Sequence, residues 1–470
     1  MKKYRFLSLI IAALLWVMPL ASVCAADAAS SSQTDGCVSL QALKPLNGSE
    51  KLLDTAKAVI LYELDSKTLV YAYQPDLTID PSGMNKIMTA LLALELKDPN
   101  DEVTAKSNPW DYAPAGSVSV ELKKGETMKL IDLLYCMLVE SANDAASVIA
   151  EYVGGNIETF VAMMNQKAME LGCRNTNFVN ANGIKAEGQY TTARDLAVIT
   201  EAALQNETFA EIFGTVTYTV PKTNKAEARD LRTSNNMMRP ANKDYYDPRI
   251  TGGRTGAVST TDRSLICTAQ DGGSRYLSVV MSASGSVTAD PNIVDKYGSY
   301  EETKQLLDFG FSKFSVYNLM LDNHAMAQFD VVNGENKVSV CPNKTVRVSL
   351  PVDAALSDIT YRCVENASIQ APVEKGQTLG YIEAWYHGIC VAKYDLLAMH
   401  DVKTADKGIS PLPLTYREPL QNETVKDIST WVLIAVLFGV AALLTVILVK
   451  RIRKDVERKH VRNALRGATK

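Results

Sequence analysis

Residues 81–94 have the sequence PSGMNKIMTALLAL, and the rest of the larger domain is expected to pack around this stretch. From Ile87 to Leu94, apolar side chains fall on nearly every face of a helix. A helix of that kind is buried on all sides, because it has no polar face to turn toward water. The sequence therefore predicts a central buried helix near Lys86, with Pro81 and Ser82 at its entrance.

The segments around this helix predict a mixed domain. Two short β-prone runs at 58–62 and 69–73 predict a hairpin. A second hairpin is predicted at 264–269 and 276–282, around a Gly-rich loop. Helical patterns lie at 130–138, 145–153, 160–171, 192–204 and 301–311. Strands at both ends of a helical middle indicate an α+β fold in which the first and last strands share a sheet.

The two ends of the chain are typical of an exported membrane protein. A basic start, an apolar run and a small-residue site predict a signal peptide at 1–25. Trp431–Val449 is an uncharged run of 19 residues, long enough to cross a bilayer. The tail 450–470 carries nine Lys and Arg against two Asp and Glu, an excess typical of the cytoplasmic side. We expect a single-pass protein of the cell membrane, with one transmembrane helix at 430–449; a buried core helix is the alternative.

Between these ends the sequence predicts four segments. They are a flexible leader at 26–52, an α+β domain at 53–320, a small all-β domain at 321–408 and a proline-stiffened stalk at 409–429. The chain has a net charge of −4, and residues 26–449 hold −14 once the +3 and +7 of the two ends are taken out. An acidic ectodomain repels phosphate backbones, so no nucleic acid partner is expected. The sequence does not identify any protein partner.

Histidine and cysteine limit the chemistry of the α+β domain. The four histidines are His324, His387, His400 and His460. None lies in that domain, so a Ser-His-Asp triad or a His-based zinc site cannot be built from its residues, and a hydrolytic base must be Lys or a carboxylate. No CxxC pair is present, and we expect no metal and no cofactor. A disulfide within the group Cys341, Cys363 and Cys390 stays open, because sequence cannot choose the pair.

Three short polar segments are candidates for a site. They are Pro81-Ser82-Gly83-Met84-Asn85-Lys86, Ser141-Ala142-Asn143-Asp144 and Gly252-Gly253-Arg254-Thr255-Gly256. Each segment alone is weak evidence for a functional site, because Ser, Asn and Gly cluster in turns for conformational reasons. In this order and context, however, they resemble the S-x-x-K, S-x-N and K-T-G elements of penicillin-recognising serine enzymes.

The chain resembles the D-alanyl-D-alanine carboxypeptidases, the low-molecular-weight penicillin-binding proteins of bacteria. The likeness covers about residues 55–410 and includes the stretches 85–91, 172–178, 190–197, 303–311 and 373–377. The resemblance implies a penicillin-binding-protein/β-lactamase-like transpeptidase domain, with an antiparallel sheet and a helical cluster, followed by a small all-β domain. It also implies peptidoglycan stem peptides as the ligand.

The resemblance further implies a role for each motif residue. In the family a serine attacks the peptide bond between two D-alanines, and a lysine three residues later accepts its proton. The second element holds the lysine and the substrate amide, and the third binds the terminal carboxylate. Carried over, these roles fall on Lys86, Ser141, Asn143, Arg254, Thr255 and Gly256. Arg254 stands where lysine is usual, and it keeps the positive charge that a carboxylate needs.

The nucleophile position departs from the family pattern. Counted back from Lys86 it is Gly83, which has no side chain to attack with. Losing the serine of a catalytic triad costs roughly 10⁶ in turnover, so acylation is not expected. Two replacements stay open. Ser82 is either a substitute nucleophile one helical turn from Lys86 or an N-cap of the helix, and Ser141 is a further candidate.

These features predict a membrane-anchored relative that keeps a stem-peptide site but has lost acylation, and so a peptidoglycan-binding or regulatory protein. The alternative is an active serine carboxypeptidase that releases the terminal D-alanine by means of Ser82. A third hypothesis treats the ectodomain as a scaffold whose cleft is vestigial.

Overall fold

The computed structural model describes residues 40–47, 51–108, 114, 116–290, 294–320 and 322–405. The predicted signal peptide, stalk, transmembrane helix and basic tail lie outside these residues. Within the described ranges, no helix is both long enough and apolar enough to cross a bilayer.

A five-stranded antiparallel sheet forms the frame of the larger domain, in the order β2-β1-β9-β8-β7. Its strands are β1 (Ala58–Glu63), β2 (Thr68–Tyr73), β7 (Ile250–Ala257), β8 (Asp262–Asp271) and β9 (Ser274–Ser284). Because β1 pairs with both β2 and β9, the two predicted hairpins join into one sheet. The expected sharing of a sheet by the first and last strands is confirmed, and β7 is left at one edge.

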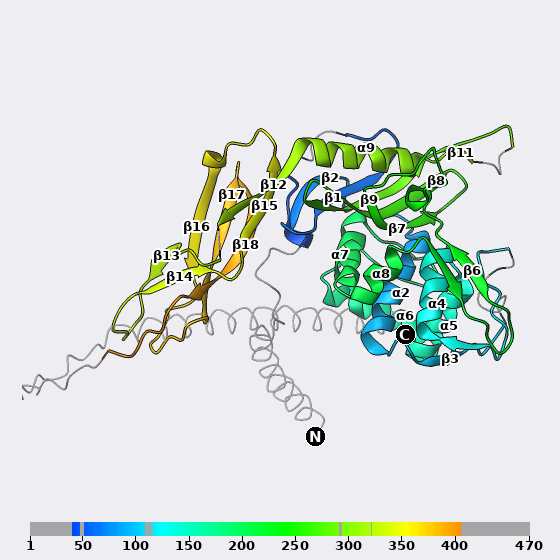
Figure 1. Cartoon of the computed structure of the whole chain (residues 1–470), viewed down its shortest axis with the longest axis horizontal. Coiled ribbons are helices and arrows are strands. Elements are labelled where there is room, and N and C mark those ends of the chain that lie inside the picture. Colours follow the sequence, from blue (N-terminus) through cyan, green and yellow to red (C-terminus); the bar gives the residue numbers. More distant parts are fainter. Residues whose placement is uncertain are drawn as a thin grey trace, which may run out of the picture. The chain divides into compact units, whose positions relative to one another are not determined.

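Helices cover both faces of this sheet (Figure 1). One face carries α2 (Asn85–Leu96), α4 (Leu130–Tyr135), α5 (Asn143–Gly154), α6 (Ile157–Glu170), α7 (Ala193–Leu204) and α8 (Glu207–Phe213). The other face carries α9 (Gly298–Lys313), which packs on β8 and β9. Residues 85–93 of α2 are all buried, as its uninterrupted apolar run predicted.

Short elements complete this domain. The helical turns are η1 (Leu40–Ala42), η2 (Ser82–Met84), η3 (Cys136–Glu140) and η4 (Asn236–Met238). The two-stranded pairs are β3 (Glu102–Thr104) with β4 (Thr127–Lys129), β5 (Thr217–Val220) with β6 (Arg229–Arg232), and β10 (Ser286–Val287) with β11 (Val294–Lys296). Most of the candidate site residues lie in η2, directly after η3, and on β7 of the main sheet.

The C-terminal domain is all β, as predicted. Its main sheet has the order β13-β14-β18-β17-β16, and β12 pairs separately with β15. The bounds are β12 (Phe314–Met320), β13 (Ala327–Phe329), β14 (Val338–Pro342), β15 (Val346–Pro351), β16 (Ile359–Glu365), β17 (Thr378–Tyr386) and β18 (Ile389–Ala398), with a short turn η5 (Leu356–Asp358). The predicted start at residue 321 was too late, because β12 belongs to this domain through its ladder with β15.

Two further expectations are corrected. The described part of the segment predicted as a flexible leader is packed, since Leu40 and Leu43 are buried and Arg194 donates hydrogen bonds to both of their carbonyl oxygens. The disulfide left open by the sequence is not formed. Cys341, Cys363 and Cys390 lie on three different strands, and all three are free thiols.

Candidate active site

The three polar motif segments meet at the edge of the sheet beside α2. Gly83 lies in η2 just before α2, Ser141 ends the π-helical turn η3, and Arg254 lies on the edge strand β7. Hydrogen bonds from Arg254 reach both other elements. The structure therefore brings Arg254 to two segments that precede it by 171 and 113 residues in the sequence.

Lys86 lies at the buried centre of this site. Its side chain is 1% exposed, and its ammonium donates to Asn143 Oδ1 at 2.7 Å and to the carbonyl oxygen of Asn182. Burial, helped by the positive charge of Arg254 and opposed by Asp144, holds the pKa of Lys86 well below its usual value. A lysine in this state suits the role of a proton acceptor, and its contact with Asn143 agrees with the predicted pairing of the first two motifs.

Arg254 is also buried, with 1% of its surface exposed. Its Nε donates to the carbonyl oxygen of Gly83 at 3.0 Å, Nη1 to that of Leu138 at 2.7 Å, and Nη2 to Ser141 Oγ at 2.9 Å. Burial lowers the pKa of Arg254 to about 9, so the guanidinium keeps its charge at neutral pH. Each of its nitrogens thus has a partner inside the protein.

Gly83 lies directly against this guanidinium. A Cβ at position 83 would lie 3.7 Å from Arg254 Nη2 and 3.3 Å from the carbonyl oxygen of Thr255. The second distance is tighter than ordinary van der Waals contact, so a side chain here requires strand β7 to yield slightly. The space at the nucleophile position is therefore small and is bordered by Arg254.

The Ser82 hydroxyl bonds strand β7 and does not cap the helix. Its Oγ donates to the carbonyl oxygen of Ala257 at 2.7 Å and accepts from the Ala257 N–H at 3.0 Å. No side-chain cap is formed at the start of η2 or α2, so the N-cap interpretation is wrong. The residue has φ +49°, a left-handed conformation that is uncommon for a side chain with a Cβ. Both hydrogen-bonding capacities of the hydroxyl are used to attach η2 to β7.

The remaining motif residues line the same region. Thr255 Oγ1 shares a hydrogen bond of 2.8 Å with Ser234 Oγ. Gly256 faces Met84, whose Cε would lie 3.3 Å from a Cβ at position 256. Ser141 has φ +73°, which turns the chain sharply between η3 and α5. Among the described residues, no group of His, Cys, Asp and Glu side chains is placed to hold a metal ion.

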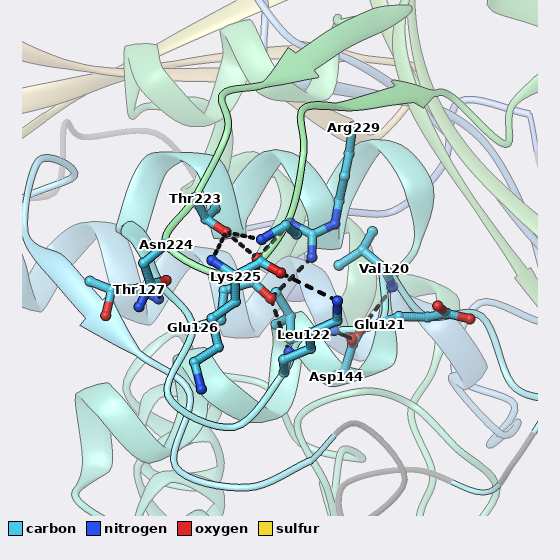
Figure 2. Close-up of polar contacts among 12 residues, drawn as sticks. Val120, Glu121, Leu122, Glu126, Thr127, Asp144, Thr223, Asn224, Lys225 and Arg229 are labelled. Atoms are coloured by element: carbon cyan, nitrogen blue, oxygen red, sulfur yellow. Dashed lines mark hydrogen bonds and ion pairs between the residues drawn. The ribbon is translucent and has the colours of Figure 1, made fainter.

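A buried polar network holds the loop beside Asn143 (Figure 2). Asp144 accepts hydrogen bonds from the backbone N–H groups of Val120 and Leu122 and from the Ser119 hydroxyl. Val118 accepts a bond from the Asn143 N–H at 2.8 Å. Asp144, which directly follows the Ser141-Ala142-Asn143 motif, thus fixes the loop at 118–122 against that motif.

A second anchor lies next to this loop. Glu126 is fully buried and receives Arg229 Nη1 at 2.7 Å and Nη2 at 3.0 Å, together with the Thr223 hydroxyl (Figure 2). Burial raises the pKa of Glu126, but the bonds from Arg229 and its neighbours outweigh this effect and lower it. This bidentate pair attaches the β5–β6 hairpin to the turn before β4.

Sequence reasoning missed the backbone partners of the site. Asn182 accepts from Lys86 through its carbonyl oxygen, and Leu138 accepts from Arg254 in the same way. Neither side chain identity signals such a role. Gly183 was also missed: it has φ +81°, and a Cβ there would collide with the carbonyl oxygen of Ser82. The Asn182-Gly183 dipeptide is a turn signal that could have marked this loop.

Family models match most of the described chain. Residues 48–285, a little over half of the sequence, match the D-alanyl-D-alanine carboxypeptidase model, and residues 314–404 match the C-terminal domain of penicillin-binding protein 5. The chain belongs to the D-alanyl-D-alanine carboxypeptidase family. The second match also supports a C-terminal domain that begins at Phe314.

Individual members of the family align over most of their length. The D-alanyl-D-alanine carboxypeptidase DacF of Bacillus subtilis is 29% identical over 361 residues, which cover 76% of this chain and 88% of the relative. DacC of Escherichia coli is 28% identical over 360 residues, with 74% and 84% covered. The crystal structure of penicillin-binding protein 5 from Haemophilus influenzae is 26% identical, with a TM-score of 0.61 over 74% of this chain and 98% of that one.

Proposed function

We propose that this chain is a membrane-anchored, extracytoplasmic family member directed at peptidoglycan stem peptides, which acts by binding or regulation because it cannot form an acyl-enzyme. One observation carries the proposal. The position three residues before the buried Lys86 is Gly83, so the residue that should attack the substrate carbonyl has no side chain. The family membership supports the stem peptide as the ligand class.

The surroundings of Gly83 support the absence of a substitute nucleophile. The Ser82 hydroxyl both donates to and accepts from Ala257, so attack would require it to leave two hydrogen bonds. Ser141 Oγ accepts a hydrogen bond from the Arg254 guanidinium, so the lone pair that faces Arg254 is not free to attack. Lys86, the only strongly perturbed lysine among the described residues, donates to Asn143 and Asn182 and to neither serine.

The test is covalent labelling of the purified protein with a fluorescent penicillin. We expect no labelled band from this chain under conditions that label an active relative such as DacF. Ser82→Ala and Ser141→Ala are treated in the same way, so that any labelled band can be assigned to one serine. A band from the natural chain that disappears in one of these variants would refute the proposal and establish an acylating enzyme with that serine.

The proposed membrane anchor rests on the sequence outside the described residues. The uncharged run Trp431–Val449 and the basic tail after it support a single C-terminal span with the folded domains outside the cytoplasmic membrane. A chain that ends at residue 429 should be released into the soluble fraction, whereas the full chain should stay with membranes after washing in high salt. Retention of the truncated chain under those conditions would contradict this anchor.

A further inference from the structure

Arg254 makes the contacts expected of a structural residue rather than of a ligand receptor. Its three hydrogen bonds reach two separate segments: Gly83 in η2, and Leu138 and Ser141 within and just after η3. Only 1% of the side chain is exposed. The position that the family uses for binding a carboxylate is therefore occupied from within.

We infer that Arg254 is an internal clamp that fills the motif site in place of a D-alanine carboxylate, so that a stem peptide binds only to molecules in which the clamp has been released. The inference rests on the proposed loss of acylation at Gly83, and it describes how that same site is controlled.

The hydrogen-bond inventory of the guanidinium supports this inference. Nε carries a single hydrogen, and the carbonyl oxygen of Gly83 uses it. The Nε–Nη2 edge, one of the edges that binds a carboxylate with two parallel bonds, therefore has no free pair of donors. The buried position leaves no room for a ligand to reach the remaining hydrogens of Nη1 and Nη2. A carboxylate could take Arg254 only by displacing its present partners.

The two departures from the family pattern lie next to each other. Arg254 Nη2 lies 3.7 Å from the place where the Cβ of a residue 83 would be, so a side chain there would be in van der Waals contact with the guanidinium. A lysine at 254 would present one compact ammonium group and could not form the same fork toward three acceptors. Arginine at 254 thus supplies a fork of hydrogen bonds that the usual lysine would not.

The decisive experiment measures reversible binding of diacetyl-L-Lys-D-Ala-D-Ala by calorimetry. It compares the natural protein with Arg254→Lys, each as the full chain in detergent. A closed site lowers the apparent affinity by the fraction of open molecules, so we expect Arg254→Lys to bind about tenfold or more tightly. Ser141→Ala removes one acceptor of the clamp and should shift the affinity in the same direction. This second variant keeps the test valid where Arg254→Lys fails to fold.

Arg194→Lys is the matched control, because Arg194 is also buried and also donates to two backbone carbonyls, at Leu40 and Leu43. It should lower thermal stability without changing peptide affinity. Tighter binding by the natural chain than by Arg254→Lys would overturn the inference and make Arg254 a direct receptor, and absence of binding in every variant would overturn it as well. Acylation is judged separately, by the protein mass after penicillin treatment, so a covalent adduct on the natural chain refutes the proposed function and not the clamp.

Discussion

At Gly83, a restored serine would enter a space that Arg254 already borders. Its Cβ would lie 3.3 Å from the carbonyl oxygen of Thr255 and 3.7 Å from Arg254 Nη2. We therefore expect Gly83→Ser alone to be acylated slowly by fluorescent penicillin. The double variant Gly83→Ser, Arg254→Lys restores the family's residue at both positions and should be labelled about tenfold faster or more, equivalent to at least about 1.4 kcal/mol in the activation barrier.

Gly83→Ala with Arg254→Lys is the control for this pair, because it adds the same Cβ without a hydroxyl and should not be labelled. Equal labelling of the single and double serine variants would show that Arg254 does not obstruct the nucleophile. If neither is labelled, the site departs from its active relatives in more than these two residues.

Ser82 is expected to contribute stability rather than chemistry. Ser82→Ala removes two hydrogen bonds to Ala257 and should lower the free energy of unfolding by about 1–2 kcal/mol. Ser82→Gly removes the same bonds but suits φ +49°, so it should be less destabilising than Ser82→Ala by about 1 kcal/mol. Urea unfolding of the three proteins measures both differences. A larger loss for the glycine variant would contradict the left-handed conformation.

Lys86 should make stability depend on pH in a predictable direction. Its pKa is lowered by folding, so between the lowered value and the ordinary value of about 10.4 the unfolded chain binds more protons. Stability therefore rises with pH in that window. Relative to Lys86→Met, the natural protein should gain stability as the pH rises toward about 10, by at most about 1.4 kcal/mol per pH unit.

Loss of the Lys86 bonds to Asn143 and Asn182 adds an offset to the stability of Lys86→Met that does not vary with pH, so the slope is the quantity to compare. Lys243→Met, at an exposed lysine, is the control and should run parallel to the natural protein. Equal slopes for the natural protein and Lys86→Met would show that the buried ammonium keeps its proton throughout.

At the scale of elements, one buried ion pair joins the β5–β6 hairpin to the turn before β4. Arg229→Met leaves Glu126 buried without its countercharge and should cost about 3 kcal/mol in urea unfolding. The double variant Glu126→Met, Arg229→Met should lose less than Arg229→Met alone, because no unpaired charge is left. Lys222→Met breaks an exposed pair with Glu227 on the same hairpin and should change stability by less than about 0.5 kcal/mol.

Elements governed by local pattern were predictable from the sequence. The β1–β2 and β8–β9 hairpins, α2 and α9 lie where alternation, turn residues and apolar periodicity placed them. The pairing of Lys86 with Asn143 followed from the family motifs. By contrast, the partners of Arg254 depend on how β7 meets η2 and η3, a contact between segments distant in the sequence. The same reason explains why the Ser82 hydroxyl was assigned to the helix when it bonds β7 instead.

At the scale of the whole chain, the boundary of the C-terminal domain depends on strand β12, which directly follows α9. The sequence placed the start at residue 321, since the β-prone alternation is clearest beyond it. The β12–β15 ladder runs from Phe314 opposite Pro351 to Met320 opposite Val346. Val348 and Leu350 in β15 are fully buried, so β12 covers a strand that belongs to the core of this domain.

This arrangement predicts that a fragment 314–405 folds and that a fragment 321–405 does not fold stably. Without β12, strand β15 loses its only ladder partner among the described strands and exposes backbone groups that favour aggregation. Thermal unfolding followed by circular dichroism should show a cooperative transition for 314–405 and a lower or absent one for 321–405. A fragment 308–405, which adds the last turn of α9, is the control for length and should gain nothing further. Equal melting temperatures for 314–405 and 321–405 would return the boundary to residue 321.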